Sequence, residues 1–375
     1  MSTTASRLSN PASLRPESAV GAGAALRGWK QIAAYLHRDV RTVQRWERAE
    51  RLPIHRQLHA KLGTIHAIRA ELDQWLAGRT SLQAEAWAAL RIRDPRAYEL
   101  CVRARQLMHQ FRRKSFERAR EMFGRAIALD PQFAIGHSGL ADCCSYLYLY
   151  WEPTVDNLRT ADSASRRAVT LSPRLAEAQV SRAIALSTLR NYPEANQTFR
   201  LAIEIDPELF EAHYFYGRAC LAQGRFKEAV VPLRAACKVR AEDYQAPAML
   251  ALAYTGLGRR KAAARAHART VVIAKQQLSV NPGDVRALYL GAGCLARLGR
   301  RKTALAWAAR ALDLDGKDSA VLYNVGCLYA ILGRTNEALR CLKKVVRSGW
   351  RKEWIKHDPD WAALRDLKEF AALVS

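Results

Sequence analysis

Hydrogen-bonding side chains suited to reading nucleic acid are concentrated in residues 40–50, VRTVQRWERAE. At helical spacing Val40, Val43 and Trp46 point to one side and leave a polar face of Arg, Thr and Gln. Arg can donate two parallel hydrogen bonds to guanine, Gln can do the same with adenine, and Thr can contact a thymine methyl group or a phosphate. We therefore predict base and phosphate contacts from Arg41, Thr42, Gln44, Arg45 and Arg48, and backbone contacts from Arg38, His59 and Lys61.

The surrounding residues supply elements that would hold this helix in a major groove. An amphipathic helix precedes it, and Asp39 is placed to cap it. Two short extended segments follow, residues 52–56 and 64–67, and then a last helix over residues 68–76. A helix pair followed by a wing predicts a winged helix-turn-helix domain over residues 26–78.

The second helix also carries a resemblance. Asp39-Val40-Arg41-Thr42-Val43 followed by Trp46-Glu47 resembles the recognition helix of the MerR/excisionase-like winged helix-turn-helix group, which reads S-V-R-T and then Val or Ile before an aromatic residue and Glu. This resemblance implies binding to double-stranded DNA. The alternative is that the domain has become a protein-interaction module.

The rest of the chain is dominated by a repeat. Several amphipathic stretches end in a polar residue followed by proline, which breaks a helix. These pairs are Asp130-Pro131, Ser172-Pro173, Asp206-Pro207 and Asn281-Pro282, and Pro173 and Pro207 are 34 residues apart. Within each unit a small residue marks a close approach of two helices, and a glycine marks the turn between them. The small residues of the first helices are Ala183, Gly217, Ala251, Ala292 and Gly326, and the turn glycines are Gly224, Gly258, Gly299 and Gly333.

This pattern resembles the tetratricopeptide repeat (TPR), a helix-turn-helix unit. Phe123, Phe199 and Leu233 match its large apolar position, whereas His267 and Ala308 depart from it. We count seven units over residues 100–352. The second and fifth units are longer than the others, and we expect residues 146–157, YLYLYWEPTVDN, to form an inserted loop.

A TPR array implies a concave groove for a peptide or a partner helix, and so favours binding over catalysis. We expect the first helices to present Tyr214, Arg218, Tyr289, Arg297 and Tyr323 to this groove. The alternative is that these Tyr and Arg side chains are ordinary surface and packing residues. The Lys/Asn set that grips a C-terminal carboxylate in one TPR subclass is not expected here, because Tyr occupies the corresponding positions.

Composition narrows the class of protein. The chain has 375 residues with a formal net charge of +25, which favours polyanionic partners, although a compositional bias toward Arg would also produce it. Its eight cysteines include no C-x-x-C pair and are expected to be buried thiols in a reducing compartment. We expect no metal, no cofactor and no enzymatic activity, since nucleotide-binding, metalloprotease and nucleophile-elbow motifs are absent from the sequence.

The predicted fold is mostly all-α, with a small winged helix-turn-helix domain and a TPR α-solenoid of about seven repeats. Residues 1–25 are expected to be a disordered tail, residues 79–99 a helical connector and residues 353–375 a capping helix region. The main functional prediction is a cytoplasmic, nucleoid-associated transcriptional regulator that binds double-stranded DNA and, through the TPR array, a partner protein or peptide. The alternative is a TPR scaffold or adaptor without productive DNA binding. No membrane partner is expected.

Overall fold

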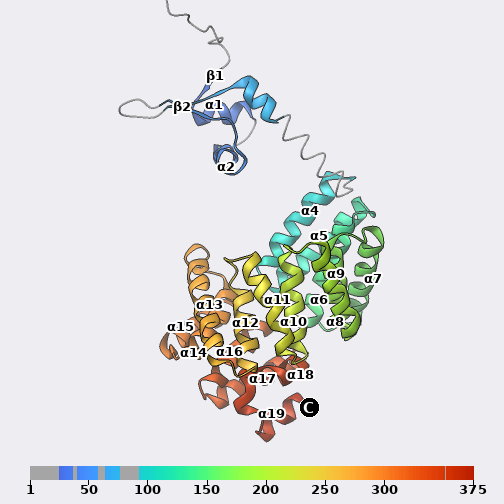
Figure 1. Ribbon diagram of the computed structural model, residues 1–375, viewed down its shortest axis with the longest axis vertical. Helices are drawn as coiled ribbons and strands as arrows, with labels where there is room; N and C mark the ends of the chain where they lie inside the picture. The colour runs from blue at the N-terminus through green and yellow to red at the C-terminus, as the bar shows by residue number, and fades with distance from the viewer. Residues whose placement is uncertain (1–24, 37–39, 58–63, 77–92, 351) are drawn as a thin grey trace, which may run out of the picture. The chain divides into compact units, whose positions relative to one another are not determined.

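The computed structural model describes residues 25–36, 40–57, 64–76, 93–350 and 352–375. The chain divides into two compact units after Arg91, and each is described by itself (Figure 1). The predicted disordered tail falls almost entirely outside the described residues, as does most of the predicted connector.

The N-terminal unit combines helices with a small sheet. Helices α1 (Gly28–Tyr35) and α2 (Val40–Glu50) pack together, and a further helix covers residues 69–76. Strands β1 (Ala25–Arg27), β2 (His55–Gln57) and β3 (Thr64–Ile68) form an antiparallel sheet in the order β1-β3-β2. The core joins both layers through Leu26, Ile32, Val43, Trp46, Leu52, Ala67 and Leu72.

Strand β1 corrects the expectation from sequence, which placed residue 25 in the tail and foresaw only the two strands of the wing. Three residues are too short to show an alternating pattern. The strand forms because β3 offers it backbone partners, with Leu26 opposite Ala67.

The second unit is a run of helical hairpins. Within residues 93–350 there are seven consecutive pairs, each made of two antiparallel neighbours joined by a short turn. The pairs are α4 (Pro95–His109) with α5 (Arg113–Leu129), α6 (Ala134–Tyr150) with α7 (Val155–Leu171), α8 (Ala176–Thr188) with α9 (Tyr192–Ile205), α10 (Phe210–Ala222) with α11 (Phe226–Val239), α12 (Gln245–Gly256) with α13 (Arg260–Val280), α14 (Val285–Arg297) with α15 (Arg301–Asp315), and α16 (Ser319–Ile331) with α17 (Thr335–Arg347). The chain ends in α18 (Lys352–His357), the 3₁₀ helix η1 (Pro359–Leu364) and α19 (Lys368–Val374).

The glycines and small residues act as the repeat predicts. The four turn glycines have φ between 67° and 73°, a left-handed conformation that lets one helix end and the next begin. At Gly217 a Cβ atom would lie 2.4 Å from Cγ of Leu233 in the paired helix, which is closer than atoms can approach. The small positions are therefore required by helix contact.

The expected inserted loop at residues 146–157 is wrong. Helix α6 continues to Tyr150 and α7 begins at Val155, so the extra residues lengthen the helices of the second pair. Tyr146 and Tyr150 are four residues apart, and their rings stack with centroids 5.9 Å apart on one face of α6. In the fifth pair the extra residues likewise extend α13 to 21 residues.

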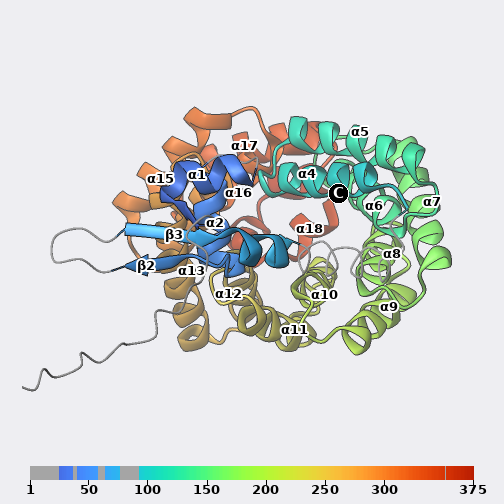
Figure 2. The ribbon, with the colours of Figure 1, turned by 90° about the horizontal axis from the view of Figure 1, so that it is seen from above.

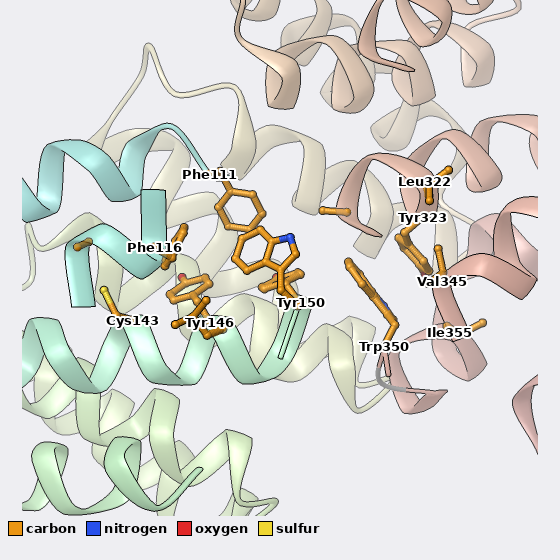
Figure 3. Packing of buried hydrophobic residues seen from close by; sticks show 14 of the residues in the cluster. Phe111, Phe116, Cys143, Tyr146, Tyr150, Leu322, Tyr323, Val345, Trp350 and Ile355 are labelled. Atoms are coloured by element: carbon orange, nitrogen blue, oxygen red, sulfur yellow. The ribbon is translucent and has the colours of Figure 1, made fainter. Parts of the chain in front are cut away.

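The array closes on itself (Figure 2). Trp151, after α6, donates a hydrogen bond from Nε1 to Asp318 Oδ2 at 2.6 Å, and Ser319 Oγ at the start of α16 donates to the carbonyl oxygen of Tyr150 at 2.5 Å. The rings of Tyr150 and Trp350 also contact each other, and Figure 3 shows them with the hydrophobic cluster around them. The first two hairpins thus share one core with the last hairpin and the C-terminal helices.

Closure changes the shape of the groove. Helix α18 lies inside the ring against α10, so the chain's own C-terminal segment fills part of the concave side.

None of the described helices is long and apolar enough to cross a lipid bilayer.

Candidate functional site

A cavity of about 1120 Å³, measured out to its mouth, lies inside the closed array. Its wall is rich in aromatic residues and is built by helices from both ends of the array. The aromatic residues that line it are Phe111, Tyr146, Tyr150, Tyr192, Phe199, Tyr214, Phe215, Tyr289, Tyr323, Trp350 and Trp354.

Two arginines interrupt this aromatic wall, Arg218 from α10 and Arg286 from α14. Arg286 lies over the Phe111 ring, with Cζ 3.8 Å from its centroid, and donates a hydrogen bond from Nη2 to the Tyr214 hydroxyl at 3.3 Å. Arg218 lies near three rings, with Cζ 5.5 Å from the centroid of Tyr150 and 5.7 Å from those of Tyr214 and Trp354. The aromatic faces therefore support both cations by cation–π contact.

Neither cation has a carboxylate within ion-pair distance among the described residues, and Asp243 acts on Arg286 only from farther away. Neither Arg218 nor Arg286 forms an ion pair there, and Nε of Arg218 is buried without a hydrogen-bond partner. Glu353 is the one acid among the described lining residues, and it pairs with Arg190 at 2.6 Å. Burial lowers the pKa of Arg218 to about 10, so the group remains cationic at neutral pH.

The structure brings four of the five predicted groove residues to this cavity: Tyr214, Arg218, Tyr289 and Tyr323. Arg297 lies instead at a neighbouring pocket, where it donates hydrogen bonds to Asp360 and to the carbonyl oxygen of Pro359. Arg297 thus holds the C-terminal segment in place.

Sequence reasoning missed part of the wall. Arg286 precedes Tyr289 by three residues and shares its helix face, a spacing that could have identified it. The predicted loop at residues 146–157 included Tyr146 and Tyr150, although their spacing is helical. Trp350 and Trp354 carried no sequence signal, because they reach the cavity only through the return of the C-terminal segment.

The neighbouring pocket holds Cys327, Asp358 and Asp360, whose ligand atoms all lie within 4.8 Å of one another. The Asp358 carboxylate already accepts a hydrogen bond from the Tyr323 hydroxyl at 2.6 Å, and Asp360 already pairs with Arg297. These interactions favour a structural role for the cluster in holding η1 against α16.

Buried carboxyl groups predict a stability that falls as pH rises. Burial raises the pKa of Asp142 to about 7, and burial followed by the neighbouring Asp360 raises the pKa of Asp358 well above its usual value. A carboxyl group with a raised folded-state pKa contributes stability that is complete below its unfolded pKa of about 4 and is lost as pH rises toward 7. We therefore expect a higher unfolding midpoint at pH 5.5 than at pH 7.5.

The measurement is urea unfolding followed by circular dichroism at both pH values. Asp142→Asn should reduce this pH dependence by up to about 1.4 kcal/mol per pH unit. The exposed Asp366, replaced by Asn in the same way, provides the control. Equal pH slopes in the wild type and Asp142→Asn would contradict the interpretation.

In the N-terminal unit, α2 separates an apolar side from a cationic one. Val43 and Trp46 are buried, whereas the side chains of Arg41 and Arg48 are exposed. Arg48 donates a hydrogen bond from Nε to the Gln44 carbonyl oxygen at 3.2 Å. Thr42 and Gln44 are half-buried, so they are less accessible than a fully outward face predicts.

The other predicted DNA contacts are not described. Arg38, His59 and Lys61 lie outside the described residues, and so does the side chain of Arg45. Arg56 of β2 forms an ion pair with Glu47 of α2, which ties the sheet to the helix.

Taken together, the second unit is a closed α-solenoid of helical hairpins with a cavity on its inner side. Models of the tetratricopeptide repeat match residues 180–247 and 319–348, so this helical array is a TPR array. Neither match extends into the N-terminal unit, which remains a small region with a three-stranded sheet.

Known proteins resemble the chain over different lengths. One similar solved structure is the human IFIT1 dimer with m7Gppp-AAAA, which is 14% identical in sequence and superposes with a TM-score of 0.51. The match covers 81% of this chain and 69% of the IFIT1 chain, and it shows a likeness of fold alone. YrrB, a TPR protein with an unusual peptide-binding site, is 23% identical over 52% of this chain and 96% of its own, with a TM-score of 0.33.

The putative adenylate cyclase 3 of Rhizobium meliloti is 33% identical over 104 residues, which are 27% of this chain and 18% of that protein. The chain thus spans less than a fifth of the curated relative that it matches.

Proposed function

We propose that this protein is a binding module whose TPR array takes up a partner protein or peptide, with the inner cavity as its main contact. The observation that carries the proposal is the convergence of Tyr214, Arg218, Tyr289 and Tyr323 from three separate hairpins on one cavity. Aromatic and Arg side chains gathered in a pocket are the composition of binding hot spots. We propose that the chain acts by binding and not by catalysis.

A peptide library displayed on phage and selected on the immobilised full chain tests this function. Selected peptides should bind the wild type, and Ala222→Trp, which fills the cavity wall, should weaken them about tenfold or more. Arg234→Gln, at an exposed position of α11 outside the described lining, is the control and should leave binding unchanged. If the selected peptides bind Ala222→Trp with the same affinity as the wild type, the cavity is excluded as their binding site.

DNA binding by the N-terminal unit is the second candidate. It is supported by the exposed Arg41 and Arg48 on α2, opposite the buried Val43 and Trp46, and by the net charge of +25. We propose that α2 enters the major groove, with Arg45 completing the cationic face. The partner bound by the TPR array would then be brought to the DNA, as a transcriptional regulator requires.

Salt dependence provides the test of this second function. If four to six phosphates are neutralised, the log–log slope of affinity against salt should be roughly −4 to −5. Replacing Arg45 by Ala should weaken the free energy of DNA binding by about 1–3 kcal/mol if Arg45 hydrogen-bonds to a base. Gel shifts with the full chain measure both, and Lys30→Ala on the exposed side of α1 is the control. Affinity that is unaffected by Arg41→Ala and Arg48→Ala would assign the retention of DNA to another part of the chain.

A further inference from the structure

The strongest unexplained feature of the molecule is the uncompensated charge in the cavity. Burying a cation without a counter-ion is costly, and two cations near one ring system also repel each other. Arg218 and Arg286 both contact Tyr214, Arg218 through the ring face and Arg286 through the hydroxyl. The fold therefore keeps two positive charges together where an anion would be stabilised.

We propose that the cavity binds a small aromatic anion, a molecule with one aromatic ring and one carboxylate or phosphate group, whose oxygens lie between Arg218 and Arg286. The proposal rests on the assignment of the cavity as the binding site, but it places a small molecule there in place of the peptide proposed above. The tests below distinguish the two occupants. Guanidinium groups bind carboxylates and phosphates through parallel, charge-assisted hydrogen bonds.

The walls account for the aromatic part of the ligand. Tyr146 stacks on Tyr150, and Tyr323 stacks on Trp350 with centroids 4.8 Å apart. The two stacks meet where Tyr150 and Trp350 pack edge to face at 5.1 Å, so the rings form one continuous aromatic wall. Rings of a ligand prefer the same offset or edge contacts.

Closure of the array favours a small ligand over a chain that threads the groove. A polymer lying along the concave side would meet Trp354 of α18, and the ring is closed by the hydrogen bonds of Trp151 and Ser319. A molecule with a single ring needs neither contact to open.

Isothermal titration calorimetry with the full chain tests the proposal. We expect 3-phenylpropanoate and phenyl phosphate to bind. The neutral 3-phenylpropan-1-ol and the non-aromatic butanoate should bind with an affinity lower by about tenfold or more. Arg218→Met and Arg286→Met should each weaken the two aromatic anions by about tenfold or more. Arg234→Met, an exposed arginine of α11, should leave the affinities unchanged.

Thermal unfolding separates loss of binding from loss of folding. Without ligand, Arg218→Met should melt at the same temperature as the wild type or higher, because it removes a half-buried charge that has no carboxylate ion-pair partner. Added 3-phenylpropanoate should raise the melting temperature of the wild type and not that of Arg218→Met. A lower melting temperature of ligand-free Arg218→Met would show that the charge is structural and would overturn the proposal.

Two other results would also overturn it. The first is equal affinity for 3-phenylpropanoate and its alcohol, since the anion would then contribute nothing. The second is an acetylated tripeptide ending in Phe that binds about tenfold more tightly than 3-phenylpropanoate, which would assign the anion to a polypeptide end. If the small anions do not bind but the phage-selected peptides still bind in a way that depends on the cavity, the proposed ligand chemistry is rejected. The proposed function then stands.

Discussion

Trp361→Ala is expected to lower the free energy of unfolding by about 3–5 kcal/mol, because it removes the largest fully buried side chain of the C-terminal segment. The Trp361 ring contacts Tyr323 and Phe370, and its Nε1 donates a hydrogen bond to the Tyr323 hydroxyl at 3.2 Å. Gly326 of α16 leaves space for this ring, since a Cβ there would lie 2.9 Å from Cη2 of Trp361. The substitution therefore leaves a cavity that the neighbouring backbone cannot fill.

Urea unfolding of the full chain measures this loss. Leu367→Ala, at a side chain with 38% exposure in the same segment, is the matched control and should cost less than about 1 kcal/mol. The Trp361→Ala variant should also weaken ligand binding in the cavity, because Tyr323 and Trp354 are held by this segment. A loss for Trp361→Ala no greater than that of the control would show that the segment does not contribute to the core.

Gly217→Leu is expected to destabilise the fourth hairpin by about 3 kcal/mol, the upper end of the usual cost of overpacking. Even the first added carbon would lie 2.4 Å from Leu233 Cγ, so α10 and α11 would have to separate. Separation would also displace Tyr214 and Arg218, which lie on the same helix as Gly217. Stability and ligand binding should therefore fall together.

Gly124→Leu serves as the control for helix propensity. Gly124 is exposed on α5, and a Cβ there meets nothing within 4 Å. This substitution should raise stability by about 0.5–1 kcal/mol, because Leu favours a helix over Gly. Denaturant midpoints of the two variants should therefore move in opposite directions, and a shift in the same direction would contradict the close-contact interpretation of Gly217.

The hairpins were predictable because their determinants are local. A small residue such as Gly217, a turn glycine such as Gly224 and a breaker such as Pro207 recur at fixed offsets, and each acts within one unit or on the next. The period therefore predicted the pairing of the helices. The prediction of a loop at residues 146–157 is wrong, because Tyr146 and Tyr150 continue the helical face of α6.

The candidate site was predictable only in part. Positions on the first helices of the hairpins indicated Tyr214, Arg218, Tyr289 and Tyr323, because the concave side of such an array is lined by these helices. The same rule placed Arg297 in the groove, whereas the structure uses it to bind Asp360. An ion pair between residues 63 positions apart has no signature in either local sequence.

By itself, the sequence of this protein determined a repeating series of helix pairs, the positions of their turns and an apolar face for each helix, because backbone propensity and side-chain spacing act over a few residues. Only the tertiary structure decided that the series closes into a ring, that α18 enters it and that Arg218 and Arg286 both contact Tyr214 without forming an ion pair. Closure depends on contacts such as the hydrogen bond between Ser319 and Tyr150, two residues that are far apart in the chain. Such contacts depend on the angles between all the successive hairpins. Small rotations between neighbouring units add up along the array, and their sum cannot be obtained from one unit alone.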